Sequence, residues 1–386
     1  MGEHLMGSYG DPLLFFTTNE IEQVVCIDKG WQWRSLYVTP TQPDLKSLLA
    51  PVAGNLTYIK TRDSFSTYNE AGNSWSGGNF NMLQPGGMYK MYAAKEASFP
   101  VIGLGVDLKQ HNVPIMRGWN WIGFASPVGM TVADAFALLS PEDGDIVKNQ
   151  FDFAIYDGYA WEGTLQALVP GEGYIYYSDY AGTKQLAYPS SDYQRKAPAK
   201  LSTRSAHKQT RSSAYPSNMN IIALVKNGEE VMTDAKVQIY ANEELRGQSS
   251  QSLTHDLHFI TVQGQGSGVM LNIVVECDGS TFEVAEPIFF NEDMLLGSMQ
   301  QPYVIQLDPT TSITNISFKK DKFGFLLQSG SPLRSVNIYD ASGRNVYSGG
   351  NNTSEVRISM EQFASGVYLV ETTLMNGRRR TFNVLW

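Results

Sequence analysis

An internal repeat marked by paired tryptophans constrains the fold of this chain more than any other feature. Residues 30–33 (GWQW) return as residues 118–121 (GWNW), and residues 75–77 (WSG) return as residues 161–163 (WEG). At nearly constant spacing, further matches pair Lys60, Phe65, Tyr68, Pro85, Gly86 and Tyr89 with Lys148, Phe153, Tyr156, Pro170, Gly171 and Tyr174. Because segments that repeat in this way fold as repeated supersecondary units, the sequence predicts two tandem modules, at 24–100 and 112–189.

Each copy is predicted to be α+β. Side chains alternate along a strand, so both indoles of the Trp-x-Trp segment lie on one face. A short amphipathic helix follows, clearest at residues 131–139, where apolar residues fall at helical spacing and Thr131 suits an N-cap. The 35 glycines and the low charged fraction of 17% favour β-hairpins elsewhere. The predicted fold class is mainly β with minor α, in which tandem α+β Trp-rich repeats precede two β-sandwich modules of Ig-like kind.

Residues 190–218 differ in composition from the rest of the chain. Ser, Thr, Ala and Pro dominate, and Asp192 is the single acid against six basic residues: Arg195, Lys196, Lys200, Arg204, Lys208 and Arg211. This composition predicts a flexible basic linker. The alternative is a tail that binds nucleic acid or a membrane, but the segment lacks interleaved aromatic residues and helical amphipathicity.

Residues 219–308 are predicted to form the next β-module, with strands at 220–226, 235–241, 259–263, 269–276 and 303–307. Its ending, LLGS followed by PYVI at 295–305, has an echo in residues 4–15. Residues 1–20 are therefore interpreted as an orphan terminal strand of an upstream copy, and the natural polypeptide is expected to extend beyond Met1.

Charge and hydropathy exclude several classes of protein. The net charge of −9 argues against a nucleic-acid partner, because phosphate binding needs a cationic surface. No apolar run is long enough to predict a transmembrane helix, and the N-terminus lacks the basic and apolar regions of a signal peptide. The only cysteines, Cys26 and Cys277, fall in different predicted modules and form no metal-binding cluster.

The C-terminal residues 312–386 carry two segments with a recognisable pattern, VNIYDASGRNVY at 336–347 and FASGVYLV at 363–370. In this order they resemble the C-terminal sorting domains of type IX secretion in Bacteroidota. The resemblance implies a secreted or outer-surface-attached protein whose C-terminal module is read by an outer-membrane export machine. The residues that match the sorting motif are Tyr339, Asp340, Gly343, Arg344, Gly366 and Tyr368. Residues 376–377 (NG) are a hairpin signal in the same module.

Residues 219–308 also resemble a recurrent unit of Bacteroidota surface proteins, through 241–247 (ANEELRG), 259–262 (FITV) and the LGS…PY ending. The Trp-rich repeats resemble modules that accompany it. Neither resemblance implies a defined activity.

No motif predicts catalysis, a metal site or a cofactor. His255 and His258 would face opposite sides of a strand, which does not suit a shared metal ion. The loop 264–268 (GQGSG) lacks the Lys of a phosphate-binding loop and is predicted to be a hairpin turn. A hydrolase site in the second repeat stays open as one hypothesis, and it requires Asp145, Asp157 and Glu162 to cluster in a cleft.

The tryptophans supply the candidate binding residues. Trp31, Trp33, Trp119 and Trp121 lie on predicted strands and are interpreted as core. Trp75 and Trp161 lie among Asn, Gly, Ser and Tyr, and they are candidates to stack on a sugar or to anchor a protein partner. The alternative is that these two indoles cover the hydrophobic layer from a loop.

These observations predict a non-enzymatic, secreted or cell-surface multi-module protein that works in adhesion, glycan binding or protein binding and carries a C-terminal sorting domain. The competing hypothesis is a non-catalytic C-terminal accessory region of a larger secreted hydrolase or protease.

Overall fold

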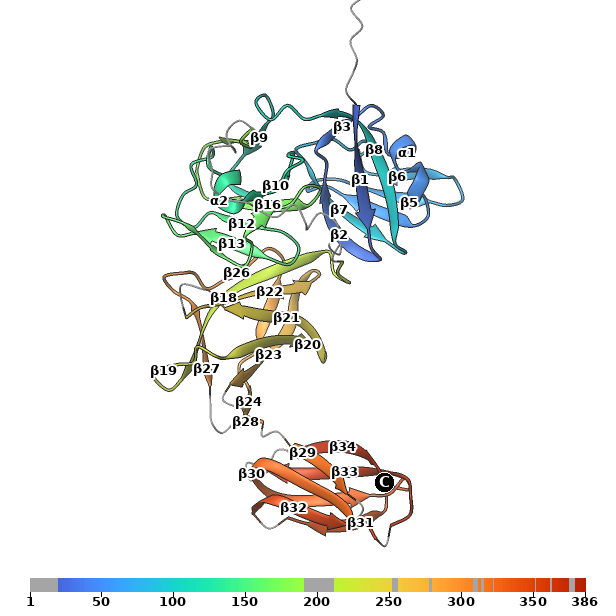
Figure 1. Ribbon diagram of the computed structural model, residues 1–386, viewed down its shortest axis with the longest axis vertical. Helices are drawn as coiled ribbons and strands as arrows, with labels where there is room; N and C mark the ends of the chain where they lie inside the picture. Colours follow the sequence, from blue (N-terminus) through green and yellow to red (C-terminus); the bar gives the residue numbers. More distant parts are fainter. Residues whose placement is uncertain are drawn as a thin grey trace, which may run out of the picture. The chain divides into compact units, whose positions relative to one another are not determined.

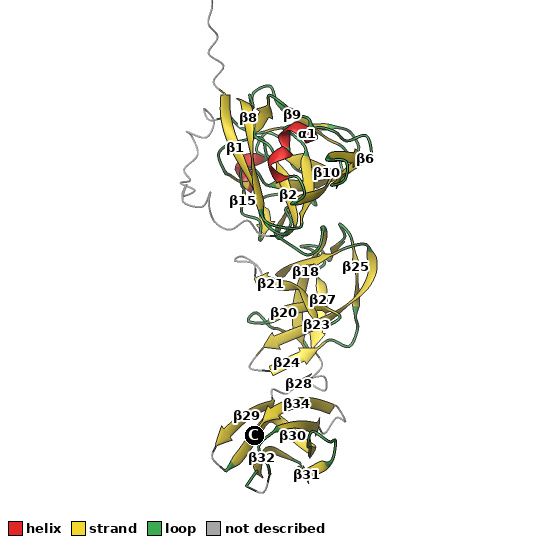
Figure 2. Cartoon of the chain, turned by 90° about the vertical axis from the view of Figure 1, so that its right-hand side faces the viewer, coloured by secondary structure: helices red, strands yellow, loops and turns green. Residues whose placement is uncertain are grey.

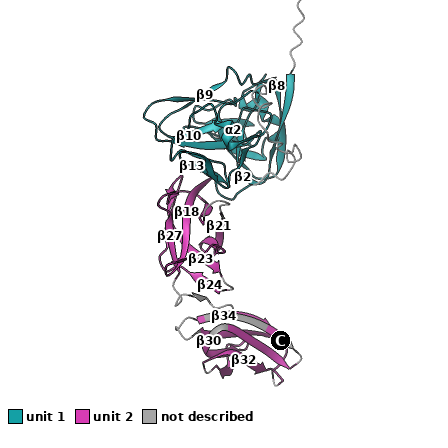
Figure 3. Ribbon diagram, turned by 60° about the vertical axis from the view of Figure 1, so that its left-hand side comes forward, with its two compact units in different colours: residues 1–216 teal, residues 217–386 magenta. Residues whose placement is uncertain are grey.

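The computed structural model describes residues 20–190, 212–251, 256–277, 280–307, 312–313, 316–321, 323–350, 352–361, 363–374 and 379–386. Strands provide almost all of the regular structure in these ranges (Figure 2), which confirms the prediction of a mainly β fold. The chain divides into two compact units, Met1–Pro216 and Ser217–Trp386 (Figure 3). The predicted orphan strand at 1–20 and the predicted linker at 190–218 lie outside the described residues except at their edges.

Unit 1 contains two five-stranded antiparallel sheets with the same strand order (Figure 1). The first sheet has the order β2-β7-β4-β5-β6, with β2 (Gly30–Ser35), β7 (Met88–Ala93), β4 (Leu56–Lys60), β5 (Phe65–Asn69) and β6 (Ser74–Gly77). The second has the order β10-β16-β12-β13-β14, with β10 (Gly118–Gly123), β16 (Gly173–Ser178), β12 (Ile146–Lys148), β13 (Phe153–Tyr156) and β14 (Trp161–Gly163). The sequence repeat is thus also a repeat of topology.

Smaller sheets complete each half of unit 1. In the first half, β1 (Glu20–Ile27) and β3 (Val38–Pro40) pair with the two sides of β8 (Ala97–Gly105). In the second half, β9 (Asn112–Ile115) pairs with β17 (Lys184–Ala187), and β11 (Met130–Thr131) pairs with β15 (Ala167–Leu168). Separate hydrophobic cores fill the two halves, one around Leu36, Leu49 and Met91 and the other around Phe124, Phe136 and Tyr174.

The helices of unit 1 are single turns. In α2 (Val132–Ala135) the Thr131 hydroxyl accepts a hydrogen bond from the Asp134 amide at 3.1 Å, so the predicted N-cap is confirmed. The helix is shorter than the predicted span 131–139, because the chain leaves helical geometry at Phe136 and continues in tight turns. In the first repeat, α1 (Leu45–Leu48) is capped by Asp44 and is followed by the 3-10 turn η1 (Ala50–Val52).

The first module of unit 2 is a single curled sheet around β18 (Ser217–Asn227). This strand pairs antiparallel with β22 (His258–Gly264) and parallel with β26 (Leu295–Leu296) and β27 (Tyr303–Leu307). The other strands are β19 (Glu230–Val231), β20 (Lys236–Ala241), β21 (Glu244–Gln251), β23 (Ser267–Cys277), β24 (Ser280–Glu283), β25 (Ile288–Asn291) and β28 (Ser312–Ile313). The five strands predicted from sequence correspond to β18, β20, β22, β23 and β27.

The predicted hairpin at residues 264–268 is wrong. These residues do join two strands, but β22 pairs with β18 and β21, whereas β23 pairs with β20, β24 and β25. The loop is a crossover within the sheet, which local turn residues cannot distinguish from a hairpin because strand partners are chosen by distant contacts.

The C-terminal module of unit 2 is built around the long strand β30 (Gly324–Tyr339). The register of β30 against β32 shifts between Gln328 and Leu333, and β30 pairs with four other strands along its length. These are β29 (Ile316–Asp321), β31 (Asn345–Gly349), β32 (Thr353–Ser359) and β33 (Val367–Leu374), and β34 (Arg379–Leu385) pairs with β33. Leu327, Val336 and Ile338 lie in its core. The hairpin predicted at 376–377 lies outside the described residues.

Candidate functional site

A tight turn closes the hairpin between β30 and β31 and is organised by Asp340. The Asp340 amide donates to the Arg344 carbonyl at 3.0 Å, and the Gly343 amide donates to the Asp340 carbonyl at 2.9 Å. One carboxylate oxygen of Asp340 accepts from the Ser342 hydroxyl at 2.5 Å and from the Ser342 and Arg344 amides. Gly343 adopts a φ of +81°, which a glycine accommodates at least cost.

These donors stabilise the ionised form of the Asp340 carboxyl. The Ser342 hydroxyl is the largest cause, and together the donors lower the pKa of Asp340 to about 2. The other carboxylate oxygen accepts from Arg344 Nε at 3.1 Å, and the Arg344 side chain is otherwise exposed. The motif residues Asp340, Gly343 and Arg344 therefore form one rigid turn.

An open groove of about 520 Å³ lies beside this turn. Leu369 on β33 is paired with Tyr339 on β30, and Val367 is paired with Leu385 on β34. The side chains of Val367 and Leu369 are 53% and 40% exposed, so the groove has an apolar floor that water reaches. Its lining residues are Tyr339, Asp340, Ala341, Gly343, Val367, Leu369, Glu371 and Asn383.

The two remaining motif residues, Gly366 and Tyr368, support the strand β33 that carries the groove. Tyr368 is buried, its hydroxyl donates to the Ala364 carbonyl at 2.7 Å, and its ring meets Phe363 edge-on. Gly366 exchanges two backbone hydrogen bonds with Trp386, and a Cβ at Gly366 would meet no atom within 4 Å. Of the six predicted residues, four thus gather at the turn and groove, and two fix the strand that carries the groove.

Comparison with known families finds a match for the C-terminal module. Residues 308–381 match the family described as secretion system C-terminal sorting domain. The chain carries a sorting domain of this kind. The sequence-based recognition is therefore confirmed, and a sorting domain implies secretion and attachment at the outer surface. No curated protein matches the chain.

Trp75 and Trp161, the predicted ligand-binding residues, lie on the edge strands β6 and β14 at equivalent positions of their sheets. Both are half-buried. The Trp75 ring contacts Tyr68 at 5.5 Å between centroids, whereas the Trp161 ring contacts Phe136, Tyr156 and Tyr176. Each indole therefore covers its core with one part and faces solvent with another.

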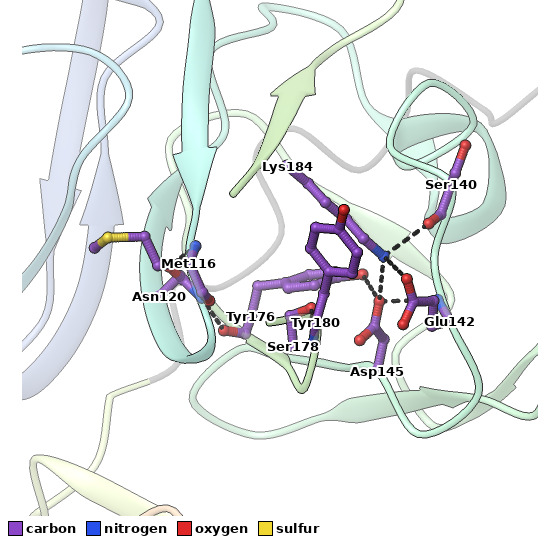
Figure 4. A network of polar contacts seen from close by, with 9 residues as sticks. All are labelled: Met116, Asn120, Ser140, Glu142, Asp145, Tyr176, Ser178, Tyr180 and Lys184. Carbon is purple, nitrogen blue, oxygen red and sulfur yellow. Dashed lines mark hydrogen bonds and ion pairs between the residues drawn. The ribbon is translucent and has the colours of Figure 1, made fainter. Parts of the chain in front are cut away.

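The carboxylates named in the hydrolase hypothesis lie in different surroundings. Asp145 is buried, accepts from the Tyr176 hydroxyl at 2.7 Å and lies 3.9 Å from Lys184 Nζ (Figure 4). Burial and the nearby Asp145 carboxylate raise the pKa of Tyr176. Lys184 also binds Glu142 and the Ser140 carbonyl, each at 3.0 Å, and so ties β17 to the turn after α2 (Figure 4).

The other two carboxylates of the hydrolase hypothesis, Asp157 and Glu162, lie in a turn and on an edge strand. Asp157 accepts from the Tyr159 and Ala160 amides and shapes their turn, and Glu162 lies half-buried on β14.

Within the described ranges, no group of three or more His, Cys, Asp or Glu residues is placed to hold a metal ion. His258 is buried on β22, and His255 lies outside the described residues. No helix in the described part of the chain is long and apolar enough to span a membrane.

The two repeats contact each other reciprocally. The Ser35 amide donates to the Gly171 carbonyl at 2.9 Å, and the equivalent Gly123 amide donates to the Gly86 carbonyl at 2.9 Å. The Gln150 side chain donates to the Trp31 carbonyl, and the equivalent Arg62 side chain donates to the Trp119 carbonyl. Such exchanged contacts are the mark of an approximate two-fold interface between like units.

Two buried lysines lie against tryptophan rings at this interface, and one of them, Lys90, contacts a ring of each repeat. Lys90 Nζ lies 4.7 Å from the ring centroids of both Trp33 and Trp121, and Lys148 Nζ lies 4.6 Å from that of Trp119. Lys90 and Lys148 are fully buried. Of the four Trp-x-Trp indoles predicted to be core residues, Trp33 is buried and the other three are half-buried. The prediction did not include these lysine partners. The sequence signal that could have indicated such a lysine is a position where the two copies differ, such as Lys90 in the first copy and Ile175 in the second.

Proposed function

We propose that this protein is a non-enzymatic binding protein of the outer cell surface, exported through its sorting domain and engaging a glycan or a surface protein through its tandem repeats. The export part rests on the groove beside the Asp340 turn, since an apolar floor next to a rigid, charged turn suits recognition by another protein. The binding part rests on Trp75 and Trp161, which present partly exposed indoles at equivalent places.

The acidic residues of the second repeat favour binding over hydrolysis. A glycosidase needs two carboxylates held on either side of a sugar bond. Asp145 instead accepts from Tyr176 and lies near Lys184, and Asp157 accepts amides of its own turn. Both carboxylates therefore have structural partners that account for their presence.

A substitution in the groove tests the export proposal. The full chain, directed to the periplasm by an added leader in a bacterium with this secretion machinery, is compared with its Leu369→Glu variant. Because Leu369 is partly exposed, the change is expected to alter the free energy of unfolding by about 0.5 kcal/mol or less. We expect the wild-type chain at the cell surface and the variant in the periplasm.

The matched control is Val304→Glu, which places the same charge at an apolar position of similar exposure in the neighbouring module. Surface display of Val304→Glu together with periplasmic retention of Leu369→Glu supports the groove as the recognition surface. Normal display of Leu369→Glu contradicts it.

A glycan array probed with the full chain tests the binding proposal. The double variant Trp75→Phe/Trp161→Phe keeps an aromatic ring against each core and removes the larger indole face, so its signal is expected to fall by about tenfold or more. Tyr159→Ala, which removes an exposed aromatic on a nearby turn, serves as the control. Equal signals from the wild-type chain and the double variant contradict a role of these tryptophans.

A further inference from the structure

A cavity of about 250 Å³ lies between the two repeats of unit 1. Trp33 and Arg34, on β2, form the wall from the first repeat. The second repeat supplies the remaining walls from residues 149–152, 164–167, 169 and 172–173. The cavity therefore exists only where the repeats are packed together, and neither repeat forms it alone.

Three charged side chains line this cavity: Arg34, Asp152 and Glu172. Two of them, Arg34 and Glu172, are of opposite sign and largely shielded from water. Arg34 is buried and donates through Nε to the Cys26 carbonyl at 3.1 Å and through Nη2 to Gln32 Oε1 at 2.5 Å. Among the described residues these contacts use two of the five N–H groups of the guanidinium. Glu172 accepts from Tyr174 at 3.3 Å and from Asn149 at 3.4 Å, distances at which hydrogen bonds are weak.

Burial disfavours the charged form of both groups. It lowers the pKa of Arg34 and raises the pKa of Glu172, and the opposite charge of each group partly offsets the effect on the other. Placing such charges in an interior is unfavourable unless good hydrogen bonds compensate for the lost hydration. The long hydrogen bonds of Glu172 replace its lost hydration poorly, so burial of Arg34 and Glu172 destabilises the folded state.

The reciprocal interface shows that this cost is not needed to join the repeats. Ile122 is the equivalent of Arg34, and Gly87 is the equivalent of Glu172. On that side the backbones pack directly, since a Cβ at Gly123 would lie 2.5 Å from the Gly87 carbonyl oxygen. The same backbone contact therefore forms on that side with no charged pair.

We propose that the cavity beside Arg34 and Glu172 binds one small neutral polyhydroxylated ligand, the terminal monosaccharide of a glycan, at a site separate from Trp75 and Trp161. Hydroxyl groups both donate and accept, which matches a wall that offers guanidinium, amide and carboxylate groups. The lining carries charges of both signs, Arg34 against Asp152 and Glu172, and the two carboxylates disfavour an anion. The cavity is smaller than most ligand pockets, so it suits a single sugar unit, with Trp33 and Phe151 as aromatic walls.

Isothermal titration calorimetry on the full chain tests this proposal with D-glucose, D-galactose and D-mannose as separate probes and with acetate as an anionic probe. At least one sugar is expected to bind with a Kd of about 0.1–10 mM, and acetate is not. Ala167→Phe fills the cavity from a half-buried lining position and leaves Arg34 and Glu172 unchanged. It is expected to weaken sugar binding by about tenfold or more, whereas Leu138→Phe, at an exposed position outside the cavity, leaves it unchanged.

Three results overturn the proposal: none of the three sugars binds, sugar binding survives Ala167→Phe, or acetate binds and the sugars do not. Arg34→Met adds a second test, in which a folded variant is expected to lose sugar binding. If Arg34→Met does not fold, Ala167→Phe alone decides. A glycan-array signal that needs the two tryptophans but survives Ala167→Phe removes this site and leaves the proposed function intact, so the two ideas fail separately.

Discussion

The Lys90 ammonium lies 4.7 Å from the ring centroid of Trp33, and both side chains are almost completely buried. The same ammonium lies 4.7 Å from the ring centroid of Trp121 in the other repeat, so one cation is shared by two equivalent indoles. Ile175, the equivalent of Lys90, packs in the same cluster as an ordinary apolar residue. The interface is thus two-fold in its backbone contacts and asymmetric in the charge at its centre.

Replacing Lys90 is expected to destabilise unit 1. Lys90→Ala removes two desolvated cation–π contacts and leaves a cavity, so the free energy of unfolding is expected to fall by about 3 kcal/mol. Urea unfolding followed by tryptophan fluorescence measures this loss. Lys60→Ala is the control, because Lys60 is half-buried and lies farther from Trp121, at 5.6 Å, and a loss below about 1 kcal/mol is expected. Equal losses of stability for Lys90→Ala and Lys60→Ala would show that sharing one cation between two indoles adds no stability.

A glycine in the same interface gives a steric prediction. A Cβ at Gly173 would lie 2.2 Å from Met88 Cγ and 2.9 Å from the Arg34 carbonyl oxygen. Gly173→Ala is therefore expected to lower the free energy of unfolding by about 2 kcal/mol, and Met88→Ala in the same chain should recover part of that loss. Gly105→Ala, whose Cβ would meet only the flexible Ile21 side-chain tip at 3.3 Å, should cost little. Thermal unfolding of Gly173→Ala, Met88→Ala and the double variant tests the coupling, with Gly105→Ala as the control, and strictly additive losses in the double variant would contradict it.

The two candidate ligand-binding tryptophans are expected to contribute differently to the free energy of unfolding. Among the residues that the structure describes, the Trp161 ring contacts three aromatic rings, whereas the Trp75 ring contacts one. Trp161→Ala is therefore expected to lower the free energy of unfolding by about 3 kcal/mol, and Trp75→Ala by about 1 kcal/mol. Paired denaturant titrations of the two variants measure the difference. An equal or reversed order would mean that these ring contacts do not govern the stability of the repeats.

The sequence predicts local structure well where the signal is periodic. Alternating apolar residues located β18, β20, β22, β23 and β27, and Thr131 identified the start of α2. The repeat also supplied residue equivalences, which make the exchanged contacts of Ser35 and Gly123 interpretable. These features depend on neighbours in sequence or on comparison of the two copies, and both are visible without a structure.

Contacts between distant residues could not be predicted in the same way. Lysine is normally exposed, so burial of Lys90 between two indoles depends on how the repeats pack. On β33, both faces carry apolar residues, with Tyr368 and Val370 inside and Val367 and Leu369 outside. Strand alternation separates these two sets but does not say which one faces the core. The sorting motif could therefore be recognised from the sequence, whereas the groove beside it could not be predicted.

Burial of His258 predicts a pH dependence of unit 2. Burial on β22 lowers the pKa of His258 below its usual value of 6.5, so the folded state favours the neutral imidazole. In the unfolded chain the imidazole takes up a proton as the pH falls below about 6.5, and that proton uptake stabilises the unfolded state. The stabilising contribution is therefore complete above pH 6.5 and is lost as the pH falls toward the lowered pKa.

Denaturant unfolding at pH 5, 6 and 8 measures this effect. As the pH falls, the free energy of unfolding should decline less for His258→Gln than for the wild-type chain, by up to about 1.4 kcal/mol per pH unit. The pH 8 measurement is the internal control, because the imidazole is neutral in both states there. Parallel declines for the two proteins would contradict the prediction.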